Sequence, residues 1–230
     1  MILYHGSDKI INSPQYGFGN PYNDYGLGFY CTEDKELAKE WACPEARNGV
    51  ANIYELDMDN FKILDLQSDQ YHVLNWIAIL LKNRVFVKKT PIAKAAEKYI
   101  LEEFLPATEG YDIISGYRAD DSYFSYAKDF LNNAISVEQL EYAMRLGELG
   151  NQIVLVSKRA VESIAFIDYE IADSHIYYAK RMQREQRARS QYLEHSENTF
   201  SNVNQGLYVL EIVRNEVKND DKRLFRTIRK

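Results

Sequence analysis

The residues best suited to chemistry stand within the first thirty positions. His5 lies between a tyrosine and a glycine in ILYHGS (residues 2–7), and Tyr30 ends GLGFY (residues 26–30). A neutral imidazole can hydrogen-bond a ribose hydroxyl, and a tyrosine ring can stack on a heteroaromatic base. Glycine has no Cβ, so a ligand can approach the main chain beside it. These residues predict a cleft for a nicotinamide nucleotide, with His5 and Tyr30 facing it and Gly6 and Gly28 on its floor.

No glycine-rich phosphate loop accompanies this predicted cleft. The sequence contains neither GxGxxG nor GxxxxGK[ST], which mark Rossmann folds and P-loops. Its two cysteines, Cys31 and Cys43, have no His or Cys pattern around them, so reduced thiols are expected and a metal site is not. The nucleotide would therefore be held by stacking and by the main chain.

The elements that must position these residues are short strands mixed with helices. Strands are predicted at 2–5, 28–31, 52–58, 61–66, 111–115, 152–156 and 164–169. Helices are predicted at 33–42, 69–82, 91–105, 119–133 and 158–163, and one begins at Ser136. Thr32 is expected to cap the first helix. We also expect strand 2–5 to pair with 28–31, and 52–58 with 61–66. This pattern indicates an α+β fold and not an alternating doubly wound one.

Four stretches, taken in order, resemble a known family. They read YHGS, NDYGLGFYCTEDKELAKEWA, YDIISGYRADD and NQIVLVS. Together they are similar to bacterial ADP-ribosyltransferase-like proteins of the diphtheria-toxin and poly-ADP-ribose-polymerase branch, which carry a His–Tyr–Glu triad on three strands. The resemblance covers about residues 1–170. It implies an ADP-ribosyltransferase-like split mixed β-sheet core with surrounding helices.

The resemblance also implies roles for individual residues in binding NAD, the ADP-ribose donor. His5 would bond the adenosine-side ribose, Gly6 would hold the nicotinamide amide through its backbone, and Tyr30 would stack on the nicotinamide ring. The third triad position falls on Gln152, where the family has glutamate. The other predicted NAD-binding residues are Ser7, Gly28 and Thr32. Ser7 could instead cap the loop that follows it.

Glutamine at the third position changes the expected chemistry. Cleavage of the nicotinamide–ribose bond develops positive charge at the ribose carbon, as glycoside hydrolysis does. Gln152 can hold a ribose hydroxyl, but it can neither ionise nor accept a proton. The candidates for a catalytic acid are Asp24, Asp120 and Asp121. The structural alternatives are an Asx turn for Asp24 and capping of the following helix for the other two.

The overall composition is that of a soluble globular protein. Hydrophobic residues make up 46% and charged residues 27% of the 230 positions, and there are 18 tyrosines. The first residues do not show the basic segment followed by a long apolar run that is typical of a signal peptide. The longest apolar stretch is too short to span a bilayer. These features predict a cytoplasmic protein with no membrane partner.

Basic residues gather after Ala172. The stretch 180–192, KRMQREQRARSQY, holds five basic residues and one acidic residue, although the whole chain has a net charge of −6. We predict a catalytic domain at 1–172 and a basic helical appendage at 173–230, with a further strand at 206–213. The appendage would bring RNA or DNA to the site through phosphate contacts, or dock an acidic protein such as an antitoxin. A solvated helix face is the simpler alternative.

The resemblance implies a NAD-dependent mono-ADP-ribosyltransferase that needs no metal and modifies a macromolecule, either nucleic acid or protein. An arginine acceptor is disfavoured because the stretch GELGNQIV lacks the E-x-E pair of arginine-directed enzymes. A toxin of a toxin–antitoxin pair or of phage defence would fit such an activity. The alternative is an inactive module of the same fold that binds NAD, a nucleotide or a protein.

Overall fold

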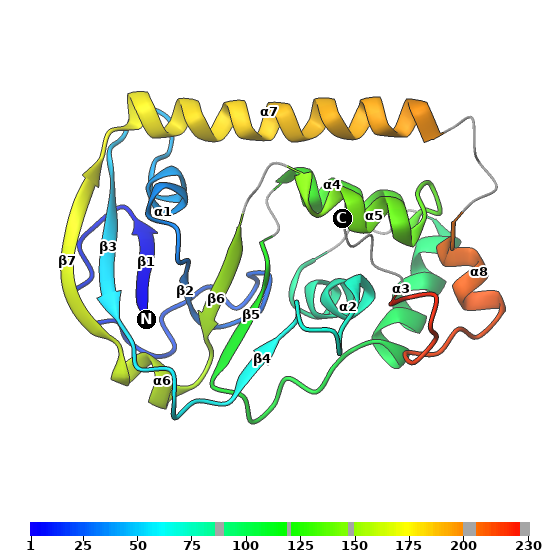
Figure 1. Cartoon of the computed structure of the whole chain (residues 1–230), viewed down its shortest axis with the longest axis horizontal. Helices are drawn as coiled ribbons and strands as arrows, with labels where there is room; N and C mark the ends of the chain where they lie inside the picture. Colours follow the sequence, from blue (N-terminus) through cyan, green and yellow to red (C-terminus); the bar gives the residue numbers. More distant parts are fainter. Residues whose placement is uncertain (86–89, 119–120, 147–149, 200–205, 226–230) are drawn as a thin grey trace. The chain divides into compact units, whose positions relative to one another are not determined.

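The computed structural model describes residues 1–85, 90–118, 121–146, 150–199 and 206–225, and Figure 1 shows the course of the chain. The strands are β1 (Ile2–Ser7), β2 (Phe29–Cys31), β3 (Gly49–Glu55), β4 (Ile63–Asp65), β5 (Ile113–Tyr117), β6 (Asn151–Leu155) and β7 (Ala165–Ala172). The helices are α1 (Lys35–Ala42), α2 (Val73–Asn83), α3 (Pro91–Glu103), α4 (Asp121–Leu131), α5 (Val137–Ala143), α6 (Lys158–Ser163), α7 (Ser174–Thr199) and α8 (Val209–Arg214). The predicted α+β class is confirmed. None of the described helices is long and apolar enough to cross a membrane.

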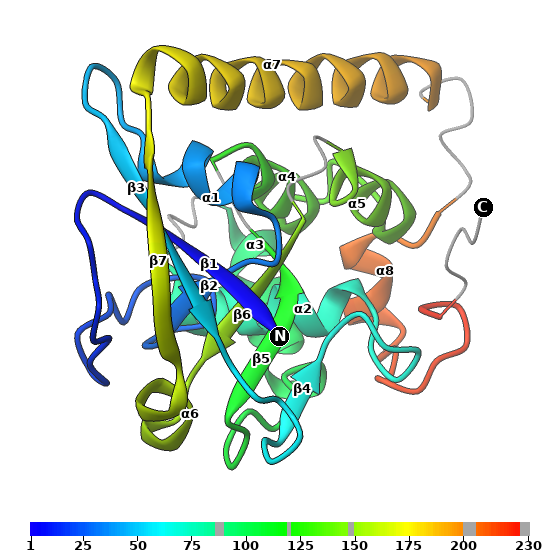
Figure 2. The same cartoon turned by 60° about the vertical axis from the view of Figure 1, so that its left-hand side comes forward.

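The strands form two sheets. The first sheet has the order β1-β3-β7 and is antiparallel throughout. The second has the order β2-β6-β5-β4, in which β4 and β5 run parallel and the other pairs are antiparallel. Only the second sheet is therefore mixed. The long strands β1, β3 and β7 of the first sheet lie side by side in Figures 1 and 2.

The predicted pairing between the first two strands is present only as a short bridge. Tyr4 and Thr32 exchange two main-chain hydrogen bonds, of 2.8 and 2.9 Å, while β1 and β2 otherwise belong to different sheets. The predicted pair 52–58 and 61–66 is wrong. The strand β3 pairs with β1 and β7, and β4 instead pairs in parallel with β5, because each finds its apolar partners in a different sheet.

An apolar cluster joins elements of both sheets. It contains Leu3 from β1, Cys31 from β2, Tyr54 from β3 and Ile153 from β6, all buried. Val161 on α6 packs in the same cluster. Alternate residues of a strand point to opposite faces, so Cys31 and Ile153 face this core while Tyr30 and Gln152 are directed to the other side of their sheet.

Helix α1 covers one face of the first sheet. A Cβ on Gly6 would lie 2.1 Å from the Ala38 carbonyl oxygen, and one on Gly49 would lie 2.3 Å from that of Ala42. Only glycine allows this close approach of strand and helix. Asp34, and not Thr32 as predicted, is the N-cap of α1, since its carboxylate accepts hydrogen bonds from the amides of Glu36 and Leu37.

The chain divides into two compact units. The first comprises residues 1–65, 108–118 and 148–186 and holds both sheets; the second comprises 66–107, 119–147 and 187–230 and is helical. The division differs from the predicted boundary near residue 172. Ion pairs explain why the start of α7 belongs with the first unit: Lys180 contacts Glu36 at 2.9 Å and Arg184 contacts Glu40 at 2.9 Å, both on α1.

The strand predicted at 206–213 is also wrong, because Val209–Arg214 forms α8. Val209 and Ile212 are buried, three residues apart, and this is the spacing of a helix face. Glu211 accepts a hydrogen bond from the amide of Tyr208 and thereby helps to start the helix. The β-branched residues in this short stretch favoured a strand in the sequence analysis.

Candidate functional site

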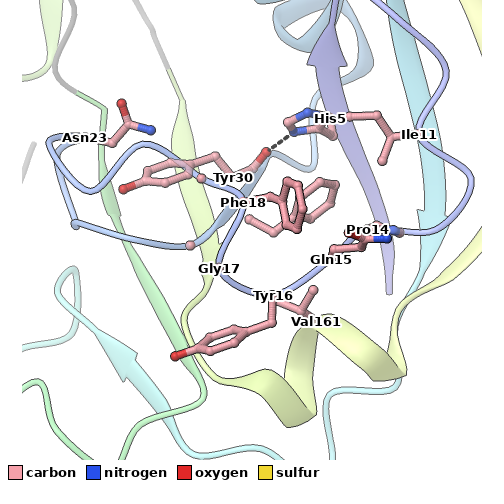
Figure 3. Close-up of a pocket in the computed structure, with 13 residues that line it drawn as sticks. His5, Ile11, Pro14, Gln15, Tyr16, Gly17, Phe18, Asn23, Tyr30 and Val161 are labelled. Carbon is pink, nitrogen blue, oxygen red and sulfur yellow. Dashed lines mark hydrogen bonds between the residues drawn. The ribbon is translucent and has the colours of Figure 1, made fainter.

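A pocket with a volume of about 240 Å³ opens in the first unit (Figure 3). Its walls come from β1, β2, α6 and the long loop between β1 and β2. The lining residues are His5, Ile11, Pro14, Gln15, Tyr16, Gly17, Phe18, Gly19, Asn23, Gly28, Phe29, Tyr30 and Val161. The pocket thus contains three of the predicted NAD-binding residues, His5, Gly28 and Tyr30, together with aromatic side chains from the loop.

His5 is fixed within this pocket by two contacts. Its Nδ1 lies 2.7 Å from the main-chain oxygen of Tyr30, and its ring stacks on that of Phe29 with centroids 4.4 Å apart. A carbonyl oxygen only accepts, so Nδ1 carries the proton and Nε2 is left as the acceptor. Burial lowers the pKa of His5, although the bond to the Tyr30 carbonyl opposes this shift. The imidazole is therefore neutral near pH 7.

Tyr30 has its hydroxyl engaged and its ring directed away from His5. The hydroxyl donates to the carbonyl of Gly26 at 2.6 Å and accepts from the amide of Tyr25 at 3.1 Å. Figure 3 shows the Tyr30 ring pointing toward Asn23, while the Tyr30 carbonyl is turned to His5. Both residues line the pocket, but their rings diverge. The expectation that the two side chains face a single cleft is met only in part.

Asn52 on β3 holds the start of the loop in place. Its Nδ2 donates to the carbonyl of Lys9 at 3.2 Å and to Ser7 Oγ at 3.0 Å, and its Oδ1 accepts from the amide of Ile11 at 2.8 Å. Ser7 Oγ in turn donates to the carbonyl of Lys9 at 2.5 Å. Ser7 is therefore engaged in loop structure and does not line the pocket. Asn52 could not be identified from the sequence, because its role depends on contacts with residues more than forty positions away.

Gln152 lies on β6 and is 7% exposed. Its Oε1 is buried and has no hydrogen-bond partner among the described residues. Tyr30 pairs with Val154, two residues along β6, so Tyr30 and Gln152 belong to the same face of the second sheet. Gln152 is not among the residues that line the pocket. A buried amide oxygen without a protein partner is uncommon in native proteins and leaves Gln152 Oε1 able to accept a hydrogen bond.

Trp41 and Arg118 were not identified as site residues from the sequence. The guanidinium of Arg118 lies over the Trp41 ring, 4.0 Å from its centroid. The indole Nε1 of Trp41 is buried without a hydrogen-bond partner among the described residues. Arg118 follows β5 two residues after Gly116, which is the cross-strand partner of Gln152. The Trp41 ring, whose Nε1 donor has no described partner, therefore belongs to the same unit as Tyr30 and Gln152.

The predicted glycines serve the packing of the protein. A Cβ on Gly6 would collide with the backbone of α1, as described above, and one on Gly28 would lie 2.5 Å from Val154 Cγ1. Gly6 therefore leaves room for α1, and Gly28 leaves room for Val154 while it also lines the pocket. A role for the Gly6 backbone in holding nicotinamide stays a prediction.

Thr32 and Asp24, two further predicted residues, do not line the pocket. Thr32 is buried, bridges to Tyr4, and its Oγ1 accepts from the amide of Asp34 at 3.2 Å. Asp24 is buried in the loop before β2. Asp121 begins α4 in the second unit, and its side chain, like the whole of Asp120, lies outside the described residues. In the described part of the chain, no group of three or more His, Cys, Asp or Glu side chains could hold a metal ion.

The basic stretch of α7 is largely engaged in ion pairs. Arg184 makes a two-pronged contact with the buried carboxylate of Glu40, at 2.9 and 3.0 Å. Lys180 pairs with Glu36, and Arg181 pairs with Glu185 on its own helix. Lys180 and Arg184 therefore bind α1, and binding of an acceptor or partner by this stretch stays a prediction.

Comparison with known proteins places the chain in one family. The family described as "Protein of unknown function (DUF3990)" matches residues 1–166. The chain belongs to this family. No curated protein and no solved structure matches it. The matched span contains His5, Tyr30 and Gln152 and ends within β7, so α7 and the C-terminal residues lie outside it.

Proposed function

We propose that this member of the DUF3990 family is a NAD-dependent ADP-ribosyltransferase that transfers ADP-ribose to a macromolecular acceptor. The observation that carries the proposal is the pocket in which a neutral His5 is held by Tyr30 among stacked aromatic rings. Its Nε2 can accept a hydrogen bond from a ribose hydroxyl. The resemblance of YHGS and GLGFY to the ADP-ribosyltransferase triad supports the same assignment.

The diverging directions of the His5 and Tyr30 rings suit an elongated ligand. In this proposal, the adenosine half of NAD lies in the pocket beside His5, Tyr16 and Phe18. The nicotinamide half lies against the Tyr30 ring, on the sheet face that Tyr30 shares with Gln152. Stacking of a base on an aromatic ring contributes about 1–3 kcal/mol. The two halves of the dinucleotide would thus be held on either side of the short strand β2.

The proposed reaction breaks one bond and forms one. The bond between nicotinamide and ribose C1′ breaks, its electron pair leaves with nicotinamide, and an acceptor nucleophile bonds to C1′ and releases its proton to solvent. The unpaired Oε1 of Gln152 can accept from a ribose hydroxyl and so orient the sugar. Because an amide carries no charge, Gln152 adds little to stabilisation of the cationic ribose, and orientation and exclusion of water must supply the rate.

Labelled NAD tests this proposal directly. The purified chain is incubated with NAD radiolabelled in the adenylate phosphate and with cell extract, and the products are divided between protease and nuclease digestion. We expect label on a macromolecule that is removed by one of the two digestions, and release of nicotinamide that requires the chain. The variant Tyr30→Ala is the matched negative control. Absence of both label and nicotinamide release with the wild-type chain would contradict the proposal.

A binding module without catalysis is the second candidate, and Gln152 favours it. In the resembling enzymes a glutamate takes this position, and glutamine cannot replace its charge. In such a module NAD would bind at His5 and Tyr30 but stay intact. Calorimetric titration with NAD, combined with chromatography of the nucleotide afterwards, separates the two candidates: binding with no nicotinamide released identifies the module.

A further inference from the structure

We propose that the free edge of β7 is a docking site at which an extended segment of another protein adds as a further strand. The segment would alternate apolar with basic residues. The inference does not depend on NAD chemistry. It rests on the open edge of the first sheet, the exposed apolar side chains along β7 and the sign of the charge around them.

The strand β7 is bonded on one side only. It pairs with β3 from Gly49–Ala172 to Glu55–Ala165, and no strand of the described chain pairs with its other side. Figures 1 and 2 show β7 at the end of its sheet, with β3 as its neighbour. Its eight residues, AFIDYEIA, include no proline or lysine, two residues that natural proteins use to block an exposed edge. The register shifts between Ile53 and Tyr54, so Asp168–Ala172 is the regular stretch.

Large apolar side chains along this strand face solvent. Ile167 is 50% exposed, Tyr169 is 41% exposed and Ile171 is 59% exposed. They alternate with Asp168 and Glu170, as expected for one apolar side of a strand. Tyr169 is also the cross-strand partner of Asn52, which is fully buried, so the exposed apolar row is confined to β7. Contiguous exposed apolar side chains of this kind are typical of interaction sites.

The acidic residues around β7 favour a partner with basic side chains. Residues 161–179 contain four acidic residues and neither lysine nor arginine. Glu170 is already paired, with Lys35 and Lys39 each at 2.7 Å. Asp168 is exposed, and its Oδ1 accepts only the amide of Tyr169 among the hydrogen bonds described. A lysine or arginine opposite Asp168 on an added strand would therefore find a carboxylate, whereas an acidic residue there would be repelled.

A second copy of the chain fits this edge less well. Residues that face each other in an antiparallel pair have the same hydrogen-bonding orientation, so two copies of β7 can pair only residues an even number of positions apart. Registers centred on 168, 169 or 170 then place Asp168 or Glu170 opposite Asp168 or Glu170 of the other copy. Like charges directly opposite are destabilising. The proposal therefore commits to a different, basic partner.

A synthetic peptide tests the docking site. The probe has the length of β7, eight residues, with lysine alternating with valine or isoleucine; one control alternates glutamate instead, and another has the probe's composition in two blocks. We expect the alternating lysine peptide to bind saturably and to shift backbone amide signals of residues 165–172 in nitrogen-15 spectra. Ile171→Lys should weaken binding about tenfold, which corresponds to about 1.4 kcal/mol. The matched control is Ile176→Lys, an equally exposed position on α7.

Three results would overturn this proposal. The first is equal binding of the block peptide, since charge alone would then suffice. The second is equal weakening by Ile171→Lys and Ile176→Lys. The third is a wild-type dimer in light scattering that Ile171→Lys converts to monomer, because the occupant would then be a second copy. Both positions are exposed, so thermal unfolding should leave the two variants within about 0.5 kcal/mol of the wild type, and the comparison then reports binding alone.

Discussion

The imidazole Nδ1 of His5 lies 2.7 Å from the main-chain oxygen of Tyr30. This bond joins a side chain of the first sheet to the backbone of the second, next to the bridge between Tyr4 and Thr32. It fixes the proton on Nδ1 and leaves Nε2 as an acceptor. A ligand that meets His5 in the pocket must therefore present a donor, as a ribose hydroxyl does.

The Tyr30 ring is expected to supply most of the affinity for nicotinamide. Tyr30→Ala should abolish NAD turnover and weaken NAD binding by about 1–3 kcal/mol through lost stacking. Tyr30→Phe keeps the ring and loses the hydroxyl bonds to Gly26 and Tyr25, so it should retain most of the affinity. Titration calorimetry with NAD measures both variants. Wild-type affinity in a folded Tyr30→Ala chain would remove Tyr30 from the site.

Gln152 should act as a hydrogen-bond acceptor and not as an acid or base. Gln152→Glu should keep or raise NAD hydrolysis, because a carboxylate can accept the same hydroxyl and also stabilise the cationic ribose. Gln152→Leu, of similar volume, should lower turnover by raising the activation free energy by about 0.5–1.5 kcal/mol, the value of one hydrogen bond. Because Gln152 does not ionise, the rates of the wild type and of Gln152→Leu should depend on pH in the same way. A large loss in Gln152→Glu would mean instead that the amide N–H is needed as a donor.

Several features of the fold could be read from local sequence, and others could not. The strand β6, which contains Gln152, follows from its β-branched residues. The next helix, α6, follows from Ser157, which caps it by accepting a hydrogen bond from the amide of Ala160. The roles of Gly6, Asn52 and Arg184 depend on partners 32 to 144 positions away in the chain. Residue type alone suggested ligand contacts for Gly6 and Arg184, whereas the three-dimensional neighbours show Gly6 packed against α1 and Arg184 ion-paired with Glu40. Long-range contacts leave no periodic signal in a single sequence.

Arg184 is expected to stabilise the fold. Its guanidinium forms a two-pronged bond with Glu40, whose carboxylate is almost fully buried. Removing one partner leaves a buried charge unpaired, so Arg184→Ala should lower the free energy of unfolding by about 3 kcal/mol. Arg187→Ala, an exposed neighbour on α7, should change it by less than about 0.5 kcal/mol. Urea denaturation measures both, and equal effects would contradict a structural role for Arg184.

Acid should weaken the fold through His72. Burial lowers the pKa of His72 to about 4. The hydrogen bonds between its Nε2 and the carbonyl and side chain of Asn219 raise the pKa, but by less than burial lowers it. Because this pKa lies below the unfolded value of about 6.5, the unfolded chain binds more protons between pH 4 and 6.5. Stability contributed by neutral His72 is therefore complete above about pH 6.5 and falls by about 3 kcal/mol as the pH drops to about 4.

The variant His72→Gln isolates this contribution. Urea unfolding at several pH values should show a smaller loss of stability on acidification in His72→Gln than in the wild type, even if the variant is less stable at pH 7. His175→Gln, at an exposed position on α7, should follow the wild-type curve. Parallel pH curves for wild type and His72→Gln would show that His72 is not buried in the neutral form.

A crystal structure with carba-NAD, in which the nicotinamide–ribose bond resists cleavage, tests the proposed site most directly. We predict a nicotinamide ring stacked on Tyr30 and an adenosine ribose hydroxyl within hydrogen-bonding distance of His5 Nε2. A bound analogue that touches neither residue, or crystals that take up none at saturating concentration, would contradict the assignment of this pocket to NAD.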